Sequence, residues 1–336
     1  MVEVLMAIFV VGIGTLSILV LFPLGMQNSA QAIAHNQTAL AAATAEALLE
    51  WRQVRVDPWV IGVPPGQENF QPVTTALVPP GSMYEYLSQP PFFTGVQIGV
   101  FDGLLNLNKG EKEYQGPSPP VFVDPLGQAV MSSFRVGEAK AVGSLGIPRS
   151  AVSFAQSAND ARRWFTLDND ASFAPNGAPE LVAGLVPRER QYSWAYVLKR
   201  PRFTEPRVAE CTIVVFRRRP LIGPNETVLT GPAADQGRIF TRGATTARVL
   251  WTPSLALRPG FWIFDATALD LASARKLGLV SQFNGYFYQV VHVSDPVRVG
   301  SEIVQEFEIS RPAKDHGYVG VLFNGIVHVI EKGAGQ

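Results

Sequence analysis

The chain has 336 residues, of which 47% are hydrophobic and only 17% are charged. This composition provides enough apolar material for a sizeable core and excludes a chain that is disordered throughout. The formal net charge is +0, because 28 basic residues balance 28 acidic ones. Bulk electrostatics therefore gives no attraction toward nucleic acid or anionic lipid. The single cysteine, Cys211, excludes an internal disulfide and a zinc site built on several cysteines.

The N-terminal segment is apolar over the length that a lipid bilayer requires. No charged residue lies between Glu3 and Glu46, and residues 4–24 are almost entirely apolar. About 20 mostly apolar residues span a bilayer as a helix. A cleaved secretory signal is the alternative, but such a signal begins with basic residues, whereas an acid stands at the start here. The sequence therefore predicts a membrane span over about residues 4–25.

The helical pattern continues beyond this apolar segment. No proline occurs from Gln27 to Val56, and this stretch is rich in alanine, the best helix former. Recurring apolar positions predict a face that packs against the rest of the chain, formed by Ile33, Leu40, Ala47 and Val54 and widened by Leu48 and Trp51. Asp57-Pro58 is expected to end the helix, because the residue before a proline avoids the α region. Pro23 is expected to kink or melt the helix earlier.

The run MVEVLMAIFVVGIGTLSILVLFPLGM resembles the N-terminus of prepilin-type proteins, which include type IV pilins, minor pilins and type II secretion pseudopilins. Val2-Glu3-Val4-Leu5 matches the part of the family's motif around a glutamate that opens a long apolar helix. The match covers roughly the first fifth of the chain. The family's short basic leader, its glycine and its aromatic first residue are absent before Glu3. We expect that the chain start is late, at an internal methionine, so that prepilin peptidase would be a partner only if an upstream leader exists.

The resemblance implies roles for two residues in assembly. In the family, the glutamate pairs with the free N-terminal amine of a neighbouring subunit, so Glu3 would set the register of assembly. Pro23 falls in the region where such helices kink or melt in filaments. A carboxylate at a helix centre in lipid costs about 2.5–3.5 kcal/mol, which favours a function for an acid kept at a membrane span. The alternative is an interfacial glutamate that interacts with the helix dipole.

Beyond residue 57 the sequence predicts a β-rich head with long loops. The 26 prolines and 30 glycines indicate many turns. Tyr192–Lys199 has the period-two pattern of a strand and Val208–Arg217 is β-branched and apolar, so we expect them to pair antiparallel. Asn324-Gly325 lies between two apolar runs and predicts a two-residue hairpin. A short helix is expected around Asn159–Phe165.

These elements define the expected fold class, which is α+β, with a helix over 1–56 packed on a mainly antiparallel head over 57–336. The prolines near 220–226 offer a division of the head into two lobes. Further strands are expected where apolar and β-branched residues gather: Val96–Phe101, Val121–Val123, Phe134–Val136, Thr227–Thr230, Arg248–Trp251, Phe261–Asp265, Tyr286–Val293, Ile303–Ile309 and Tyr318–Ile330.

The residues that could carry chemistry favour a structural protein over an enzyme. The four histidines have no metal-ligand spacing, and no nucleophile elbow, Walker loop or dinucleotide fingerprint occurs. Cys211 lies in an apolar strand and is expected to be a buried, inert thiol. Asp168-Asn169-Asp170 weakly resembles a calcium loop, but the required glycine is missing, so an ordinary polar turn is expected. We therefore expect no catalytic residue, no metal and no cofactor.

Basic residues gather around the predicted strand pair, at Lys199, Arg200, Arg202, Arg207 and Arg217–Arg219. Some minor pilins bind DNA, so a patch that contacts phosphates is one interpretation. The antiparallel pairing places 217–219 at the far end from the turn, which favours solvated strand ends that deter edge pairing. No nucleic-acid partner is expected.

The sequence thus favours a minor pilin or pseudopilin, a structural subunit of a type IV pilus or a type II secretion-like filament. Its expected partners are other pilins or pseudopilins, an inner-membrane assembly platform and the lipid bilayer. The head would lie in the periplasm, with the chain in the inner membrane before assembly and in the pilus or pseudopilus afterwards. The alternative from another class is a membrane-tethered periplasmic binding module or enzyme. Such a tether needs neither a helical extension after the membrane nor an acid at its start.

Overall fold

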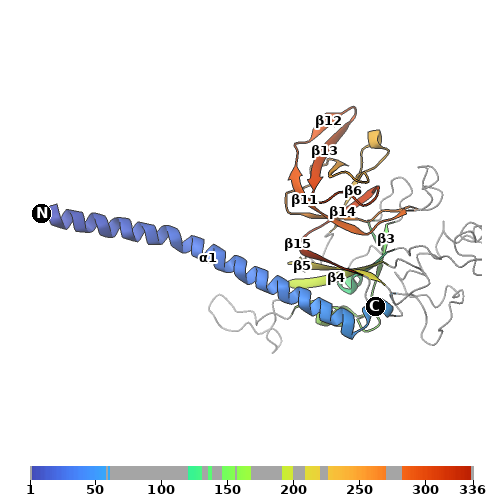
Figure 1. The fold of residues 1–336 in the computed structure, drawn as a ribbon, viewed down its shortest axis with the longest axis horizontal. Helices are drawn as coiled ribbons and strands as arrows, with labels where there is room; N and C mark the ends of the chain where they lie inside the picture. The colour runs from blue at the N-terminus through green and yellow to red at the C-terminus, as the bar shows by residue number, and fades with distance from the viewer. Residues whose placement is uncertain are drawn as a thin grey trace, which may run out of the picture.

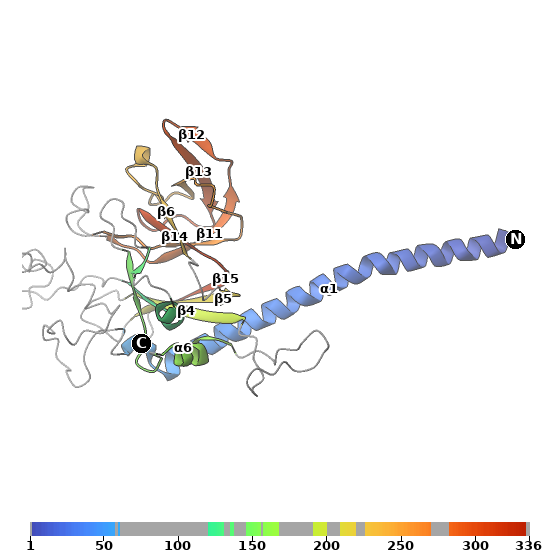
Figure 2. The same cartoon turned by 180° about the vertical axis from the view of Figure 1, so that it is seen from behind.

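The computed structural model describes residues 2–57, 60, 120–130, 135–137, 146–155, 157–167, 191–199, 209–219, 226–269 and 282–333. Helix α1 (Val2–Trp51) projects from a mainly β head, with its N-terminus far from both sheets (Figures 1 and 2). After α1 the chain turns at Gln53, whose φ is +50°, into the short 3-10 helix Val54–Val56. The sheets of the head lie one above the other, and the last turns of α1 pass beneath the first of them (Figure 1).

The first sheet packs on α1. Its strands are all antiparallel neighbours except β1 and β3, which run parallel. In order they are β15 (Ile326–Lys332), β5 (Glu210–Arg217), β4 (Tyr192–Lys199), β1 (Val121–Val123), β3 (Ile147–Ser150) and β2 (Arg135–Val136). Two short helices, α5 (Pro125–Val130) and α6 (Ala158–Phe165), contact each other and this sheet. The expected pairing of β4 with β5 is confirmed, with Tyr192 opposite Arg217 and Lys199 opposite Glu210.

The second sheet is antiparallel and curled. Its order is β12 (Val297–Val299), β13 (Glu302–Ile309), β11 (Tyr286–Val293), β8 (Trp262–Asp265), β14 (Val319–Phe323) and β6 (Glu226–Thr230). β7 (Thr246–Leu250) pairs with β13 and also contacts β6, which brings the two sides of the sheet toward each other. The pair β9 (Ala268–Leu269) and β10 (Gln282–Phe283) and the 3-10 helix Ala233–Asp235 complete the described elements of the head.

Three apolar clusters hold these layers together. The first lies between α1, α6 and the first sheet, the second fills the curl of the second sheet, and the third lies between the two sheets. Strand β4 contributes to two of them, because Trp194 and Tyr196 face α1 while Ala195 and Val197 face the second sheet. A strand buried on both faces alternates in side-chain size and not in polarity, which is the pattern seen in its sequence.

The expected fold class, α+β with a transmembrane and amphipathic helix packed on a head, is wrong. The described residues form a mainly β protein of two sheets. No helix among them is both long and apolar enough to cross a membrane. The apolar residues of α1 lie on all sides of the helix, as the exposed run Ile8, Phe9, Val10 and Val11 illustrates, and only its last part packs on the head. Uniform apolar content does not define a packing face, because equivalent side chains occur all around the helix.

The expected hairpin at Asn324-Gly325 is also wrong. The turn is present, but β14 before it belongs to the second sheet and β15 after it belongs to the first. The chain therefore passes from one sheet to the other at this turn. Gly325 has a φ of +87°, and its carbonyl accepts a hydrogen bond of 2.7 Å from the amide of Arg217. A Cβ at this position would lie 2.4 Å from the Arg217 carbonyl oxygen, so the turn requires glycine.

Several other expected elements are confirmed with small shifts in their ends. The expected helix around Asn159–Phe165 is α6, the expected strand Tyr286–Val293 is β11, and Val121–Val123 is β1. The strand expected at Val96–Phe101 and the turn at Asp168–Asp170 lie outside the described residues, as does most of the boundary near 220–226. The two sheets share an apolar cluster, and the chain passes from β14 in the second sheet to β15 in the first.

Candidate functional site

The outer part of α1 exposes apolar side chains around its whole circumference. The large ones that are described from Val2 to Ile13, together with Met26, Ile33 and Leu40, are between 53% and 73% exposed. Monomeric soluble proteins seldom expose apolar surface of this extent, and such surface marks a site of contact with another protein or with lipid. The projecting helix is therefore the candidate interaction site of the chain (Figure 1).

The two residues expected to act in assembly both lie on this helix. Glu3 is exposed in the first turn of α1, where the helix dipole favours an acidic side chain. The helix continues through the position of Pro23 without interruption, although the side chain of Pro23 lies outside the described residues. Within the part of the chain that the structure describes, Glu3 forms no ion pair, so its carboxylate is open to solvent or to a neighbouring molecule.

The inner part of α1 docks on the first sheet through small residues. Ala41, Ala45 and Leu49 are at most 1% exposed. The absence of long side chains allows two tyrosines of β4 to reach the helix backbone: the hydroxyl of Tyr196 donates to the carbonyl of Ala45 at 2.7 Å, and that of Tyr192 lies 3.4 Å from the carbonyl of Ala34. Buried hydroxyls need such partners. These contacts therefore fix how closely α1 approaches the first sheet and which side of the helix faces β4.

The face expected to pack on the head is largely wrong. Four of its residues are exposed, namely Ile33, Leu40, Ala47 and Trp51, whereas Leu48 and Val54 are buried as expected. The observed face, Ala41, Ala42, Ala45, Leu48 and Leu49, lies about one residue further along the chain, which rotates it by roughly 100°. The small side chain of alanine contributes little to an apolar pattern, but it allows the helix to approach the sheet closely.

Trp51 lies on the surface and not in the core. It is 68% exposed, and its ring centroid lies 5.9 Å from that of Trp164 on α6. The guanidinium of Arg52 lies 4.3 Å from the Trp51 ring and 4.4 Å from the Trp164 ring. These cation–π contacts hold the end of α1 beside α6. The aromatic residue at the helix end therefore stabilises a surface junction.

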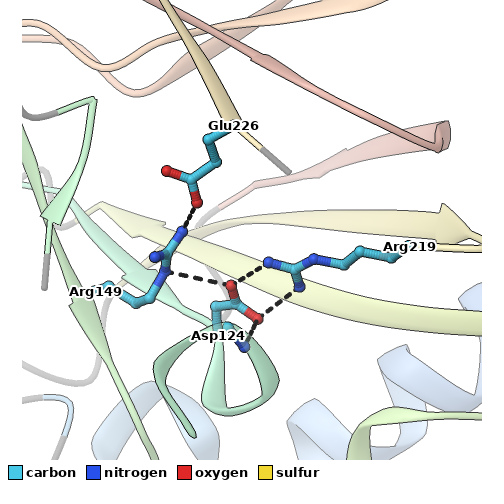
Figure 3. Close-up of polar contacts among 5 residues, drawn as sticks. Asp124, Arg149, Arg219 and Glu226 are labelled. Atoms are coloured by element: carbon cyan, nitrogen blue, oxygen red, sulfur yellow. Dashed lines mark hydrogen bonds and ion pairs between the residues drawn. The ribbon is translucent and has the colours of Figure 1, made fainter. Parts of the chain in front are cut away.

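A buried ion network joins the two sheets (Figure 3). The carboxylate of Asp124 accepts two hydrogen bonds from Arg219, at 2.6 and 2.7 Å, and lies 3.3 Å from the Nε of Arg149. The backbone amide of Gly127 donates to the same carboxylate at 3.0 Å. Arg149 also pairs with Glu226, the first residue of β6. All four charged side chains are at most 8% exposed, so two acids and two bases are buried as a neutral group.

The electrostatics of this network favour its charged form. Burial alone would raise the pKa of Asp124, but the charge and hydrogen bonds of Arg219, with those of Arg149 and Gly127, lower that pKa below its ordinary value. Burial lowers the pKa of Arg149 to about 10, which leaves it a cation at neutral pH. Each of these charged groups has an oppositely charged partner in the network, so the network can stabilise the head.

The basic cluster expected as solvated strand ends is therefore partly wrong. Arg219 is buried in the ion network, Lys199 donates to the hydroxyl of Tyr286 at 2.8 Å, and Arg217 lies 6.0 Å from the ring of Tyr192. The turn residues Arg200, Arg202 and Arg207 lie outside the described residues. No sequence signal pointed to the pairing of Arg219 with Asp124, because the two residues are 95 positions apart.

Asp265 is a buried acid held by neutral groups. Its carboxylate accepts hydrogen bonds from the hydroxyl of Thr267 at 2.6 Å and from the amide of Asn284 at 2.7 Å. Burial raises the pKa of Asp265 to about 7 despite these bonds, and the nearby charge of Asp315 acts in the same direction. The titration of Tyr288 is coupled to it, since the negative charge of Asp265 helps to raise the pKa of that phenol.

This pKa predicts that the head is less stable at pH 8 than at pH 5. Between the ordinary pKa of 3.8 and about 7, the folded chain binds a proton that the unfolded chain lacks, so stability falls as the pH rises through this range. Asp265→Asn should remove this dependence and stabilise the chain at pH 8 by on the order of 2 kcal/mol. Urea unfolding at both pH values would measure the effect. Asp295→Asn, at an exposed position, should keep the wild-type profile, and an unchanged profile in Asp265→Asn would contradict the assignment.

The described residues offer little else for chemistry. They contain no group of three or more histidine, cysteine, aspartate or glutamate side chains that could hold a metal ion. The prediction that Cys211 is buried is confirmed, and burial raises the pKa of its thiol to about 12, so it is protonated and unreactive at neutral pH. No family model matches the chain, and neither does any curated protein or solved structure.

Proposed function

We propose that the chain is a structural subunit of a filament of the type IV pilus or type II secretion kind, in the role of a minor pilin or pseudopilin. The observation that supports this most directly is the outer part of α1, whose large apolar side chains are more than half exposed among the described residues. Helices of neighbouring subunits would cover that surface in the assembled filament. The N-terminal resemblance to prepilin-type proteins supports the same function independently.

The head and the helix have separate tasks in this proposal. The head, stabilised by its shared core and its buried ion network, lies in the periplasm and carries the contacts to neighbouring heads. The subunit meets the assembly platform at the inner membrane, and its helix then packs against other pilins or pseudopilins. Glu3 pairs with the terminal amine of a neighbour, which sets the axial position of the subunit.

Cysteine cross-linking tests this function because the chain has a single, buried cysteine. We expect Ile33→Cys, at a position 60% exposed on α1, to form a cross-linked dimer with a partner pilin that carries one cysteine in its own helix, when a bifunctional maleimide is added to cells that assemble the filament. Val297→Cys is the matched control, since Val297 is 61% exposed but lies on β12, far from α1 (Figure 1). Its cross-linking should be at least about tenfold lower, which corresponds to about 1.4 kcal/mol in a contact equilibrium.

The same experiment separates the filament subunit from a membrane-tethered binding module or enzyme. A tether would have no helix of a partner pilin beside residue 33, so Ile33→Cys would give no cross-linked dimer in cells where the filament is assembled. Equal, low cross-linking at both positions would therefore contradict the proposal.

A further inference from the structure

A cavity opens between the two sheets of the head, and we call it the intersheet cavity. Its volume is about 230 Å3. The first sheet contributes Lys199, Glu210, Glu331 and Lys332 to its lining, and the second sheet with its following loop contributes Tyr286 and Lys314. Figures 1 and 2 show β11 of the second sheet close to β15 of the first sheet in both views. Ligand sites occur preferentially at such junctions between structural units.

Lysines are concentrated at this cavity. The chain contains seven lysines and twenty-one arginines. Each lysine in the part of the chain that the structure describes lines the intersheet cavity: Lys199, Lys314 and Lys332. Arginines instead form the buried ion network and most of the surface ion pairs. A lysine ammonium is a compact charge with three donors, which suits contact with a small anion whose position is not fixed by a planar pair of hydrogen bonds.

Two of these lysines converge on one phenol. The Nζ of Lys199 lies 4.4 Å from the centre of the Tyr286 ring and donates to its hydroxyl at 2.8 Å, while the Nζ of Lys314 lies 4.7 Å from the same centre. Both ammonium groups are attracted electrostatically to the face of the aromatic ring. They also repel each other, because like charges share one small region. An anion bound between them would offset that repulsion.

The charged groups around the cavity carry a net charge that one bound anion would neutralise. Lys332 pairs with Glu46 of α1 at 2.7 Å. Glu331 pairs with Arg311 and lies 3.6 Å from Lys314. With Glu210 opposite Lys199 on the neighbouring strand, the three lysines and Arg311 face three carboxylates, an excess of one positive charge. The two acids of the lining do not neutralise the site completely.

We propose that the intersheet cavity binds a small molecule through a phosphate or carboxylate group held by Lys199 and Lys314. The hydroxyls of Tyr286 and Thr212, which also line the cavity, supply further hydrogen bonds to it. The ligand is small, because the cavity is below the range of roughly 300–1,000 Å3 that is usual for drug-sized molecules. This binding function belongs to the head and does not depend on filament assembly.

Calorimetric titration of the full chain with inorganic phosphate, and separately with acetate, tests the proposal at low ionic strength. We expect saturable binding of at least one probe, and the two titrations distinguish a phosphate site from a carboxylate site. Lys199→Met and Lys314→Met should each weaken binding by about tenfold or more, since each removes one charge-assisted contact. Tyr286→Phe, which removes only a hydroxyl, should weaken it less. Arg298→Met on β12 removes one exposed positive charge elsewhere and should leave the affinity unchanged.

Lysine acetylation of the wild-type chain gives a second measurement that does not depend on folded variants. The probe should slow acetylation of Lys199 and Lys314, detected by mass spectrometry of the peptides that contain them. Equal affinity in the wild type and both lysine variants would overturn the proposal. So would the absence of saturable binding and of protection with either probe up to about 50 mM, a concentration far above typical ligand affinities.

Discussion

Asp124→Asn is expected to lower the free energy of unfolding by about 3–5 kcal/mol, the usual cost of breaking a buried ion pair. The substitution keeps the size of the side chain and removes its charge. Arg219 and Arg149 then both lose the charge of the carboxylate that they contact, in a region where all side chains of the network are at most 8% exposed. The uncompensated positive charge would be buried between the sheets (Figure 3). Urea unfolding of the full chain, followed by tryptophan fluorescence, would measure the loss.

Two comparisons make this prediction specific. Glu306→Gln breaks an ion pair with Arg248 whose side chains are 44% and 54% exposed, and it should cost less than about 1 kcal/mol. The double variant Asp124→Asn with Arg219→Met restores neutrality to the remaining pair of Arg149 and Glu226. It should therefore lose clearly less stability than the sum of the two single variants. A strictly additive result, or equal losses for Asp124→Asn and Glu306→Gln, would show that the network contributes no more than a surface pair.

The ion network illustrates what the sequence could not predict. Asp124 follows a three-residue strand, Arg149 lies on another short strand, and Arg219 follows β5. No periodic pattern connects them, because their meeting depends on the order of the strands in the sheet. The parallel pairing of β1 with β3 places Arg149 beside Asp124, and that order follows from long-range packing. Local patterns carry no information about such contacts.

Strands with a strong local signal were predicted well, for a physical reason that also explains the failures. Tyr192–Lys199 is buried on both faces and packs large residues on one side and smaller ones on the other, so its period of two reflects a real difference between environments. Helix α1 lacks such a difference, and its packing face was placed at Ile33 and Leu40 in place of Ala41 and Ala45. The turn at Asn324-Gly325 was predicted, but the sheet switch that it makes was not.

The two candidate sites also differ in how far the sequence alone could predict them. The apolar character of the outer helix and the position of Glu3 are properties of consecutive residues, so the sequence alone indicated an interaction surface there. The intersheet cavity gathers Lys199, Lys314 and Lys332 from three separate parts of the chain. In the sequence, Lys199 was grouped with the arginines that follow it, and the other two lysines carried no signal. Sites assembled from distant segments require the topology to be known first.

Phe264→Ala should cost about 3–5 kcal/mol and should loosen both sheets at once. Phe264 is fully buried in the cluster between the sheets. Its ring centroid lies 4.5 Å from that of Phe287 in the second sheet and 5.5 Å from that of Phe122 in the first. Removal of the ring leaves a cavity that both sheets border. Faster hydrogen exchange is therefore expected in β4 as well as in β8 and β14, in addition to a lower unfolding midpoint.

Phe240→Ala is the matched control for this effect. Phe240 is equally buried, but its ring contacts Tyr288 and Phe307 within the curl of the second sheet, at centroid distances of 5.0 and 6.4 Å. Its loss should cost a similar amount, because the same side chain is removed from a packed core. The faster exchange should then be concentrated in the second sheet, with β4 changed less than by Phe264→Ala. If Phe264→Ala leaves exchange in β4 at the level of the Phe240→Ala variant, the two sheets unfold as independent units, and the shared core does not couple them.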